Sequence, residues 1–127
     1  MHRFKAENSL VKRQEDSLRI RRKFPDRVPV ILECREGSNV PPIDKYKYLV
    51  PNDLTVGQFA YVIRRRAKVS PEQAMFLFVA NILPVSSMDM GTLDFDHRDE
   101  DGFLYITYSG ENTFGGGIHV KRYVSHS

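Results

Sequence analysis

The residues with the clearest chemical potential are three consecutive glycines, Gly115 to Gly117, which follow Phe114. Glycine has no Cβ atom, so a glycine run can enter an active-site cleft that is too narrow for a branched side chain. The preceding segment, 103–108, has β-favouring or apolar residues on both faces, which is typical of a strand in the middle of a sheet. A buried strand that continues into a slim tail presents its own backbone carbonyl as a substrate. The alternative is a strand followed by an ordinary linker.

The side chains that usually perform catalysis form no recognisable constellation. The single cysteine, Cys34, lies on the predicted core face of a strand with no neighbouring histidine, so we expect a buried structural cysteine. The four histidines are scattered, without zinc-ligand spacing. The aspartates from Asp94 to Asp101 lack the fixed glycine and terminal glutamate of a calcium loop, and we expect a solvated acidic loop. With no nucleotide-binding fingerprint either, the sequence favours a substrate and binding module without a cofactor over an enzyme.

Composition and charge narrow the class of protein further. The 127 residues are 41% hydrophobic and 28% charged, which is ordinary for one globular domain. A lone cysteine and an N-terminus without an apolar signal region predict a cytoplasmic protein that would meet a membrane by attachment. Residues 1–27 carry nine Lys or Arg against four Asp or Glu, whereas residues 71–127 carry three against eight. Because nothing resembles a nucleic-acid module, we expect acidic partners and no nucleic acid.

Hydrophobic periodicity predicts the elements of the first half. Residues 9–23 are expected to form a helix that stops before Pro25, after a shorter helix over 4–8. Residues 28–34 predict a strand whose second face presents Pro29 and Ile31 as surface apolar groups. A turn signal at 37–39 predicts a hairpin to a second strand, 45–50, which could form a sheet edge.

The second half adds a helix and two strands. A capping-box pattern, Thr55 to Gln58, opens a helix whose apolar stripe runs to Ala67. The continuous apolar run 75–79 predicts an internal strand, residues 84–91 a loop or short helix, and residues 103–108 the final strand. This order predicts an α+β fold with helices on one face of a mixed sheet.

Three segments, FPDRVPVI (24–31), KYKYLVPNDLTVGQF (45–59) and DGFLYITYSGENTFG (101–115), resemble the ubiquitin-like autophagy modifiers of the GABARAP and microtubule-associated protein light-chain family. The resemblance implies a ubiquitin-like β-grasp fold with two extra N-terminal helices. It divides the chain into a helical extension (1–24), a ubiquitin-like core with a conjugation tail (25–115) and a propeptide that is removed (116–127).

The resemblance also implies a conjugation pathway. A processing cysteine protease would cut after a glycine, and activating and conjugating enzymes would pass the carboxyl along as thioesters to phosphatidylethanolamine on the autophagosome membrane. The match ending in Phe114-Gly115 favours Gly115 as the reactive carboxyl, because Phe114 offers the protease a side chain to grip; Gly116 and Gly117 are the alternatives. Two other functions stay open: a modifier attached to proteins, and an unconjugated adaptor that binds microtubules or receptors.

The family further recognises cargo receptors through acidic aromatic-x-x-aliphatic peptides, which would add as a strand at 45–50. The implied aromatic pocket consists of Asp16, Ile20, Pro29, Ile31, Lys47, Leu49 and Phe103. The implied aliphatic pocket consists of Tyr48, Val50, Pro51, Leu54, Phe59, Val62 and Ile63. The cations expected to meet the acidic flanks are Arg27, Lys45, Lys47 and Arg66. Asp16 stands where the family more often has Glu, which weakens the expectation of a hydrogen bond to an indole. The alternative is that the N-terminal helix simply covers these apolar residues.

Overall fold

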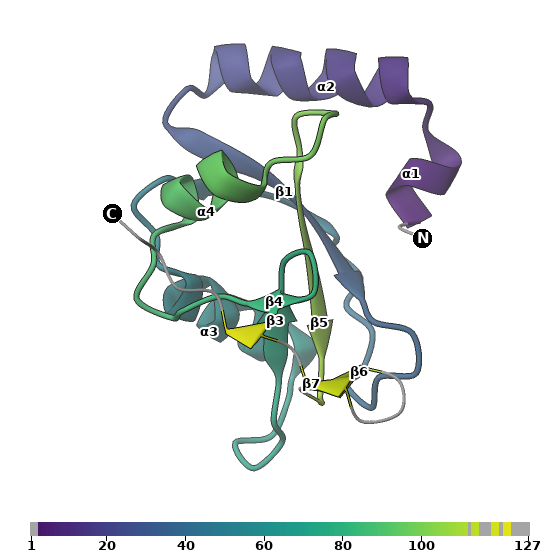
Figure 1. Ribbon diagram of the computed structural model, residues 1–127, viewed down its shortest axis with the longest axis vertical. Coiled ribbons are helices and arrows are strands. Elements are labelled where there is room, and N and C mark those ends of the chain that lie inside the picture. The colour runs from purple at the N-terminus through teal and green to yellow at the C-terminus, as the bar shows by residue number, and fades with distance from the viewer. Residues whose placement is uncertain (1–2, 112, 115–117, 120, 123–127) are drawn as a thin grey trace.

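A computed structural model describes residues 3–111, 113–114, 118–119 and 121–122 of the chain (Figure 1). Its helices are α1 (Arg3–Glu7), α2 (Leu10–Lys23), α3 (Val56–Ala67) and α4 (Met90–His97). Its strands are β1 (Arg27–Cys34), β2 (Lys47–Pro51), β3 (Phe76–Phe78), β4 (Ile82–Leu83), β5 (Leu104–Ser109), β6 (Thr113–Phe114), β7 (Ile118–His119) and β8 (Lys121–Arg122). The predicted order of helices, hairpin, helix and strands is confirmed; β4 and β6 to β8 were not predicted.

The main sheet is mixed and has the strand order β2-β1-β5-β3. β1 pairs antiparallel with β2 and parallel with β5, and β3 pairs antiparallel with β5. The central position expected for 103–108 is therefore confirmed. The prediction of an internal strand at 75–79 is wrong, because β3 is an edge strand. Its apolar run is nevertheless buried, with Leu77 5% and Phe78 1% exposed, since both faces of this edge are covered.

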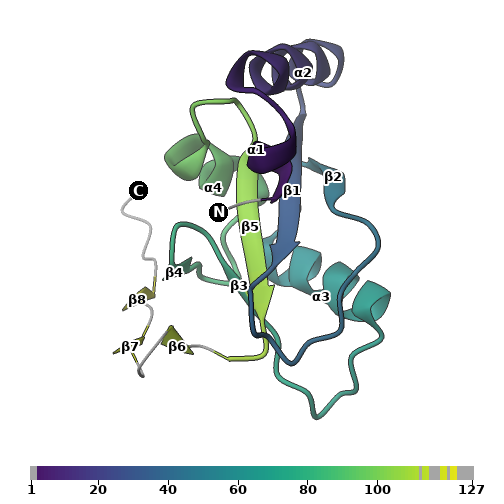
Figure 2. The same ribbon diagram turned by 90° about the vertical axis from the view of Figure 1, so that its right-hand side faces the viewer.

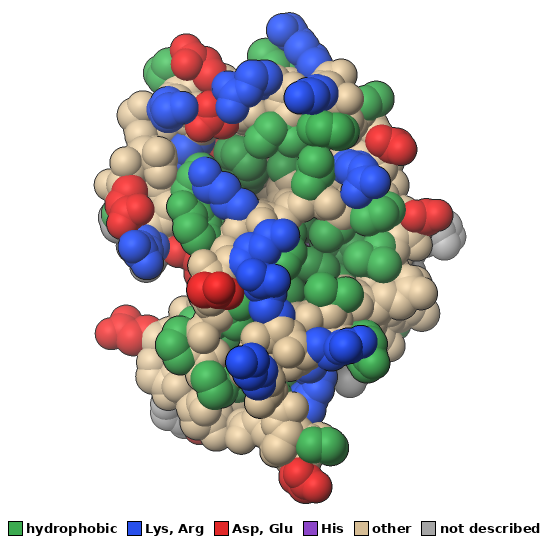
Figure 3. Space-filling model, turned by 180° about the vertical axis from the view of Figure 1, so that it is seen from behind, with side chains coloured by type: hydrophobic (Ala, Val, Ile, Leu, Met, Phe, Trp, Pro, Cys, Tyr) green, Lys and Arg blue, Asp and Glu red, His purple; other side chains and the backbone are tan. Residues whose placement is uncertain are grey.

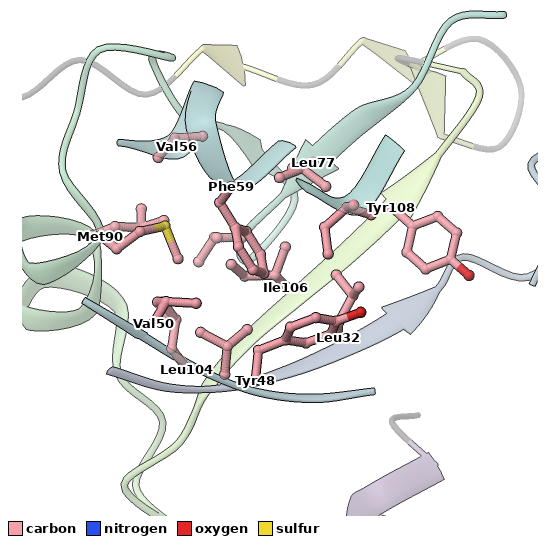
Figure 4. Close-up of a cluster of buried hydrophobic side chains, with 14 of the residues drawn as sticks. Leu32, Tyr48, Val50, Val56, Phe59, Leu77, Met90, Leu104, Ile106 and Tyr108 are labelled. Carbon is pink, nitrogen blue, oxygen red and sulfur yellow. The ribbon is translucent and has the colours of Figure 1, made fainter. Parts of the chain in front are cut away.

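Helix α3 covers one face of the sheet and builds the larger core. The predicted capping box forms: Thr55 Oγ1 accepts a hydrogen bond from the Gln58 N–H, and Gln58 Oε1 accepts one from the Thr55 N–H. Its apolar stripe, with Phe59 1% and Ile63 0% exposed, packs against residues such as Ile106 on the sheet (Figure 4). This large apolar cluster fixes the position of β2 from the α3 side.

Helices α1 and α2 contact the opposite face, so the expectation of helices on one face only is wrong. A second, smaller cluster joins Phe4 of α1 to Ile31, Phe103 and Tyr105 of the sheet, with Ile20 of α2 packed against it. Ile31, expected at the surface, is 1% exposed. The N-terminal helices therefore complete a second layer rather than forming a separate appendage.

Buried ion pairs attach α2 to the turn before β5 and to α4. Arg13 Nη1 lies 2.7 Å from Asp101 Oδ2, and the Tyr105 hydroxyl also donates to Asp101. Arg21 makes a bidentate pair with Asp94 at 2.8 and 3.0 Å. The prediction of a solvated loop over 94–101 is wrong. Residues 94–97 belong to α4, and the side chains of Asp94 and Asp101 are buried, at 3% and 1% exposure. The arginines of α2 supply the countercharge that makes this burial possible.

Cys34 is exposed, contrary to the sequence-based expectation. It is the last residue of β1, so the core that covers Val30 and Leu32 ends before reaching it. It borders a cavity of about 450 Å³ between α1 and the segment that leads into β2. No helix in the described part of the chain combines the length and the apolar character needed to cross a membrane.

Candidate functional site: the β2 edge

The first feature of the site is the unpaired edge of β2. Among the residues that the structure describes, β2 pairs with β1 alone, which leaves one side of the strand without a described neighbouring strand. The register places Leu49 opposite Pro29 and Lys47 opposite Ile31, so these four side chains share the face that α2 approaches. An exposed edge offers backbone N–H and C=O groups to an added strand, and alternate side chains of that strand would point toward this face.

A cavity of about 290 Å³ opens between α2 and the β1–β2 edge. Its lining residues are Asp16, Arg19, Ile20, Phe24, Pro29, Val30, Ile31, Lys45, Lys47, Tyr48, Leu49 and Phe103. All seven residues of the predicted aromatic pocket are among them, so the structure brings this set together. Figure 3 shows a face of the molecule on which apolar side chains gather in hollows flanked by Lys and Arg side chains. The arrangement suits a flat apolar group whose neighbours are acidic.

Asp16 contributes a negative charge to the rim of this cavity. Its carboxylate accepts hydrogen bonds from Lys12 Nζ at 3.0 Å and from Arg19 Nη1 at 3.1 Å. The bond from Lys12, assisted by Arg19 and opposed by burial, holds the pKa of Asp16 below its usual value. Because these cations already occupy the carboxylate, a ligand N–H would have to compete for it. This agrees with the weakened expectation of an indole hydrogen bond.

The two lysines of the rim lie over aromatic rings. Lys47 Nζ is 5.2 Å from the centroid of Phe4, and Lys45 Nζ is 4.7 Å from that of Tyr48. Both residues are exposed, so their ammonium groups stay available to solvent and to an incoming anion while the stems cover apolar surface. Together with Arg19, they are the basic residues that line the cavity of about 290 Å³.

The other two predicted cations are further along the edge. Arg27 donates to the carbonyl of Leu49 at 3.4 Å, which ties it to the strand itself. Arg66 lies 3.4 Å from Asp44 in an ion pair whose side chains are 44% and 86% exposed. An exposed pair of this kind contributes little stability, so a peptide carboxylate could replace Asp44 at small cost.

The predicted aliphatic pocket is largely closed. Of its residues, Tyr48, Val50, Phe59 and Ile63 belong to the core under α3, where the rings of Tyr48 and Phe59 meet edge to face at 5.5 Å. Pro51 and Val62 are exposed, and Leu54 and Val62 line an open hollow of about 500 Å³ on the outer side of α3. The structure therefore places the seven aromatic-pocket residues around one cavity, whereas it divides the aliphatic-pocket residues between the core and the surface. A ligand side chain would reach the buried members only if β2 and α3 moved apart.

Sequence reasoning missed the residues that hold the cavity open. Phe4 stacks edge to face on Phe103 at 5.3 Å and so supports the floor of the pocket. Arg13, Ser17 and Arg21 anchor α2; their spacing of four gives a polar stripe that would ordinarily face solvent. The acidic run 94–101 was the signal that this stripe had a buried partner.

Gly102 explains how closely α2 approaches the sheet. Its φ of +91° is in the region that favours glycine, and an added Cβ would lie 2.2 Å from Ser17 Oγ. Ser17 Oγ donates to the carbonyl of Asp101. A larger residue at position 102 would therefore push α2 away and change the width of the cavity.

Of the predicted conjugation residues, the structure describes only Phe114. Phe114 belongs to the short strand β6, whereas Gly115, Gly116 and Gly117 lie outside the described residues. Among the residues that the structure does describe, no three His, Cys, Asp or Glu side chains are grouped so as to hold a metal ion.

Comparison with known sequences identifies close relatives. The family model described as "Autophagy protein Atg8 ubiquitin like" matches residues 12–115. Autophagy-related protein 8d of Arabidopsis thaliana is 62% identical over 112 residues, which cover 88% of this chain and 93% of the relative. Autophagy-related protein 8 of Mycosarcoma maydis is 57% identical over 112 residues, with 88% and 95% coverage.

Solved structures show the same similarity in three dimensions. The crystal structure of Trypanosoma brucei ATG8 superimposes with a TM-score of 0.83 at 41% identity, covering 91% of this chain and 99% of that one. Plasmodium falciparum Atg8, solved in complex with a Plasmodium falciparum Atg3 peptide, superimposes with a TM-score of 0.81 at 36% identity, covering 87% and 98%.

Proposed function

Because the chain belongs to the Atg8 family of ubiquitin-like autophagy proteins, we propose that it is a modifier whose Gly115 carboxyl becomes joined to phosphatidylethanolamine. The observation that carries this proposal is where the family match stops. It includes residue 115, whereas this chain continues for residues 116–127. A chain with a family-like end and an additional segment beyond it is what a precursor that requires trimming would have. The protein would then be a substrate of enzymes rather than an enzyme.

Trimming is a chemical requirement of the proposed pathway. A thioester forms only at a free terminal carboxylate, so a cysteine protease must first use water to hydrolyse the Gly115–Gly116 bond, leaving a carboxylate on Gly115 and an amine on Gly116. An activating enzyme and a conjugating enzyme would then carry the acyl group to the lipid amine. The similarity to an Atg8 that was solved with an Atg3 peptide supports a conjugating-enzyme partner for this chain.

The product would be anchored to the autophagosome membrane. Phosphatidylethanolamine brings two acyl chains, which is the minimum for stable attachment of an otherwise cytoplasmic domain. The β2 edge and the α2 cavity would stay free on this anchored domain. We infer that they bind acidic aromatic-x-x-aliphatic segments of cargo receptors, with the aromatic side chain in the cavity of about 290 Å³.

The test is reconstitution with defined components. The chain is incubated with the processing protease from the same cells, and then with activating enzyme, conjugating enzyme, ATP and vesicles that contain phosphatidylethanolamine. Intact mass spectrometry should find a product that ends at Gly115 and then a lipid adduct. Gly115→Ala should block both steps, and Gly117→Ala is the matched control that should not. A product ending at Gly117, or a lipid adduct of Gly115→Ala, would show that Gly115 is not the glycine that becomes conjugated.

An unconjugated adaptor that binds microtubules through the basic N-terminal part is the alternative. The structure leaves fewer basic side chains of the N-terminal part exposed for binding microtubules than the sequence suggested. Arg13 and Arg21 are held in buried pairs with Asp101 and Asp94, so these two cations do not face a partner. A modifier attached to proteins would appear in the same mass measurement, as a protein adduct in place of the lipid adduct.

A further inference from the structure

The chain leaves the main sheet at the end of β5, and side chains of a neighbouring loop hold it there. β5 pairs with β1 as far as Cys34 and Tyr108, and with β3 as far as Phe76 and Ser109. Gly110 is the first residue beyond both ladders. In Figure 2 this end of β5 lies at the bottom of the sheet, opposite α2, beside the loop that joins β1 to β2. Support for the chain at Gly110 therefore has to come from outside the strands of this sheet.

Ser38, in the turn after β1, supplies this support. Its Oγ accepts a hydrogen bond from the Gly110 N–H at 3.2 Å and a second one from the Val40 N–H at 3.1 Å. The turn is itself fixed, because the Ser38 N–H donates to the carbonyl of Arg35 and the Arg35 N–H donates to the carbonyl of Tyr108. Val40 is 2% exposed and belongs to the larger core. Ser38 therefore connects Gly110 to a loop that is tied to β5 and anchored in the core.

Gly110 is packed too closely for a larger residue. An added Cβ would clash with Asn39 Oδ1 and would lie 3.1 Å from Gln73 Nε2. Asn39 belongs to the same loop as the serine, and Gln73 belongs to the segment before β3, so two separate parts of the chain meet at this glycine. The next residue, Glu111, donates its N–H to Ser109 Oγ at 3.1 Å, and Ser109 is 2% exposed. These contacts define where the chain leaves the sheet and in which direction.

We propose that Ser38 is a positioning residue for the conjugation pathway: by holding Gly110, it directs the tail, residues 111–115, toward the enzymes that bind the domain. This inference rests on the proposed attachment at Gly115. Gly115 follows Gly110 by five residues, a reach of at most about 18 Å in a fully extended chain. An enzyme bound to the domain must find the Gly115 carbonyl within this reach, and a fixed starting direction reduces the number of positions that the tail has to search. Ser38 acts on the reaction only through Gly110.

The hydrogen bond to Gly110 can be tested without any enzyme. Amide hydrogen exchange of the isotopically labelled full chain is followed by nuclear magnetic resonance, with and without the substitution Ser38→Ala. We expect the Gly110 N–H to exchange roughly threefold or more faster in the variant, because its acceptor is removed. The Ile106 N–H inside β5 reports any loss of overall stability, so the effect is the change at Gly110 beyond that at Ile106. Equal changes at the two amides would show that Ser38 does not hold Gly110.

The positioning role is tested with the processing protease. Ser38→Ala should lower kcat for cleavage roughly threefold to tenfold while KM stays within about twofold, because the domain still binds the protease but the tail enters its cleft less often. Ser38→Thr keeps the hydroxyl group and should restore most of the rate. Ser87→Ala changes an exposed serine in the loop before α4 and is the matched control, which should be cleaved at the unaltered rate.

A flexible insert separates positioning from stability. A short Gly-Ser segment placed after Glu111 frees the tail from its starting direction, whether or not the Ser38 hydroxyl is present. Ser38→Ala should therefore have no further effect on kcat in the chain with the insert, whereas a general loss of stability would act equally with and without it. The same loss of rate in both backgrounds would contradict the positioning role.

The outcomes also separate this inference from the proposed function. An unaltered kcat for Ser38→Ala, with the cut still after Gly115, would overturn the role of Ser38 and would still support the proposed function. A chain that is not cut after Gly115 would remove the proposed function and the positioning role with it. The exchange of the Gly110 N–H decides in either case whether the hydrogen bond that the role requires is formed.

Discussion

The two faces of the sheet are covered by different means, and the difference explains where a binding site can form. Under α3 the contact is a continuous apolar cluster that includes Phe59 and Ile63, and it closes completely. Under α2 a small apolar cluster is combined with two buried ion pairs, Arg13–Asp101 and Arg21–Asp94. These ion pairs hold α2 at two fixed points, so side chains need not fill all of the space between the helix and the sheet. The cavity that Ile20 lines is the part of this space that stays open.

Removing one of the ion pairs should have the largest effect. Arg13→Ala would leave Asp101, which is 1% exposed, without its countercharge. We expect a loss of about 3–5 kcal/mol in the free energy of unfolding, measured by urea titration. Arg19→Ala is the matched control, because the Arg19 side chain is 67% exposed in its pair with Asp16. If both variants lost the same small amount, α2 would not be held in the way described.

Truncation at the cavity should affect binding more than stability. Leu49→Ala removes apolar area from the cavity wall. The substitution should weaken the binding of an acidic aromatic-x-x-aliphatic peptide by about 1–3 kcal/mol, as measured by calorimetry. Leu18→Ala, at a position of α2 that is 50% exposed and outside this cavity, should leave the affinity unchanged. Equal affinities of the two variants, with thermal unfolding curves unaltered, would place the peptide elsewhere.

The peptide itself can distinguish the open pocket from the closed one. Replacing its aromatic residue by alanine should cost about 2 kcal/mol or more, since that side chain enters a cavity that already exists. Replacing its aliphatic residue should cost about 1 kcal/mol or less, because part of its contact energy is used to separate β2 from α3. The two calorimetric values are compared on the same protein. A larger loss at the aliphatic position would mean that the second pocket is preformed in solution.

The smallest expected effect concerns pH and the docking of α1. Lys5 Nζ lies 2.6 Å from Asp99 Oδ1; although burial opposes ionisation, the bonds from Lys5 and from the Asp101 N–H lower the pKa of Asp99. Its folded pKa is therefore below the unfolded value of about 3.9, so the stabilisation is present above that pH and is lost as the pH falls through the folded pKa.

This contribution should be about 1 kcal/mol or less, because the pair is partly exposed. The free energy of unfolding is measured from pH 7 down to pH 3 for the unaltered chain and for Asp99→Asn. The unaltered chain should lose more stability below pH 4 than the variant does. Parallel curves would show that Asp99 is not held by Lys5 in solution.

Local patterns predicted most of the fold. The capping box at Thr55, the stripe of α3 and the alternation in β5 depend on neighbours within a few residues, and these elements were predicted correctly. The face of the sheet that α2 covers could not be predicted, because Arg13 and Asp101 are 88 residues apart and their pairing appears only in three dimensions. The edge position of β3 was missed for a related reason: an apolar run reports burial and not the number of neighbouring strands.

The candidate site shows the same division. The aromatic pocket was predicted by the resemblance of 24–31 and 45–59 to a known family, and the structure places its residues around one cavity. The aliphatic pocket was predicted by the same resemblance and is largely closed, because whether Phe59 faces a ligand or the core depends on how far β2 lies from α3. The resemblance indicated which residues lie near each other, but it did not indicate the separation between β2 and α3.

We expect the aromatic side chain of a receptor peptide to bind between α2 and β2. This is measured by titrating the isotopically labelled full chain with an acidic aromatic-x-x-aliphatic peptide and following the titration by nuclear magnetic resonance. The largest chemical-shift changes should cluster at Ile31, Lys47 and Leu49, with contacts from the peptide aromatic ring to the side chains of Ile20 and Ile31. Changes centred instead on the shallow hollow beside α3 that Tyr61 and Ser86 line would contradict it.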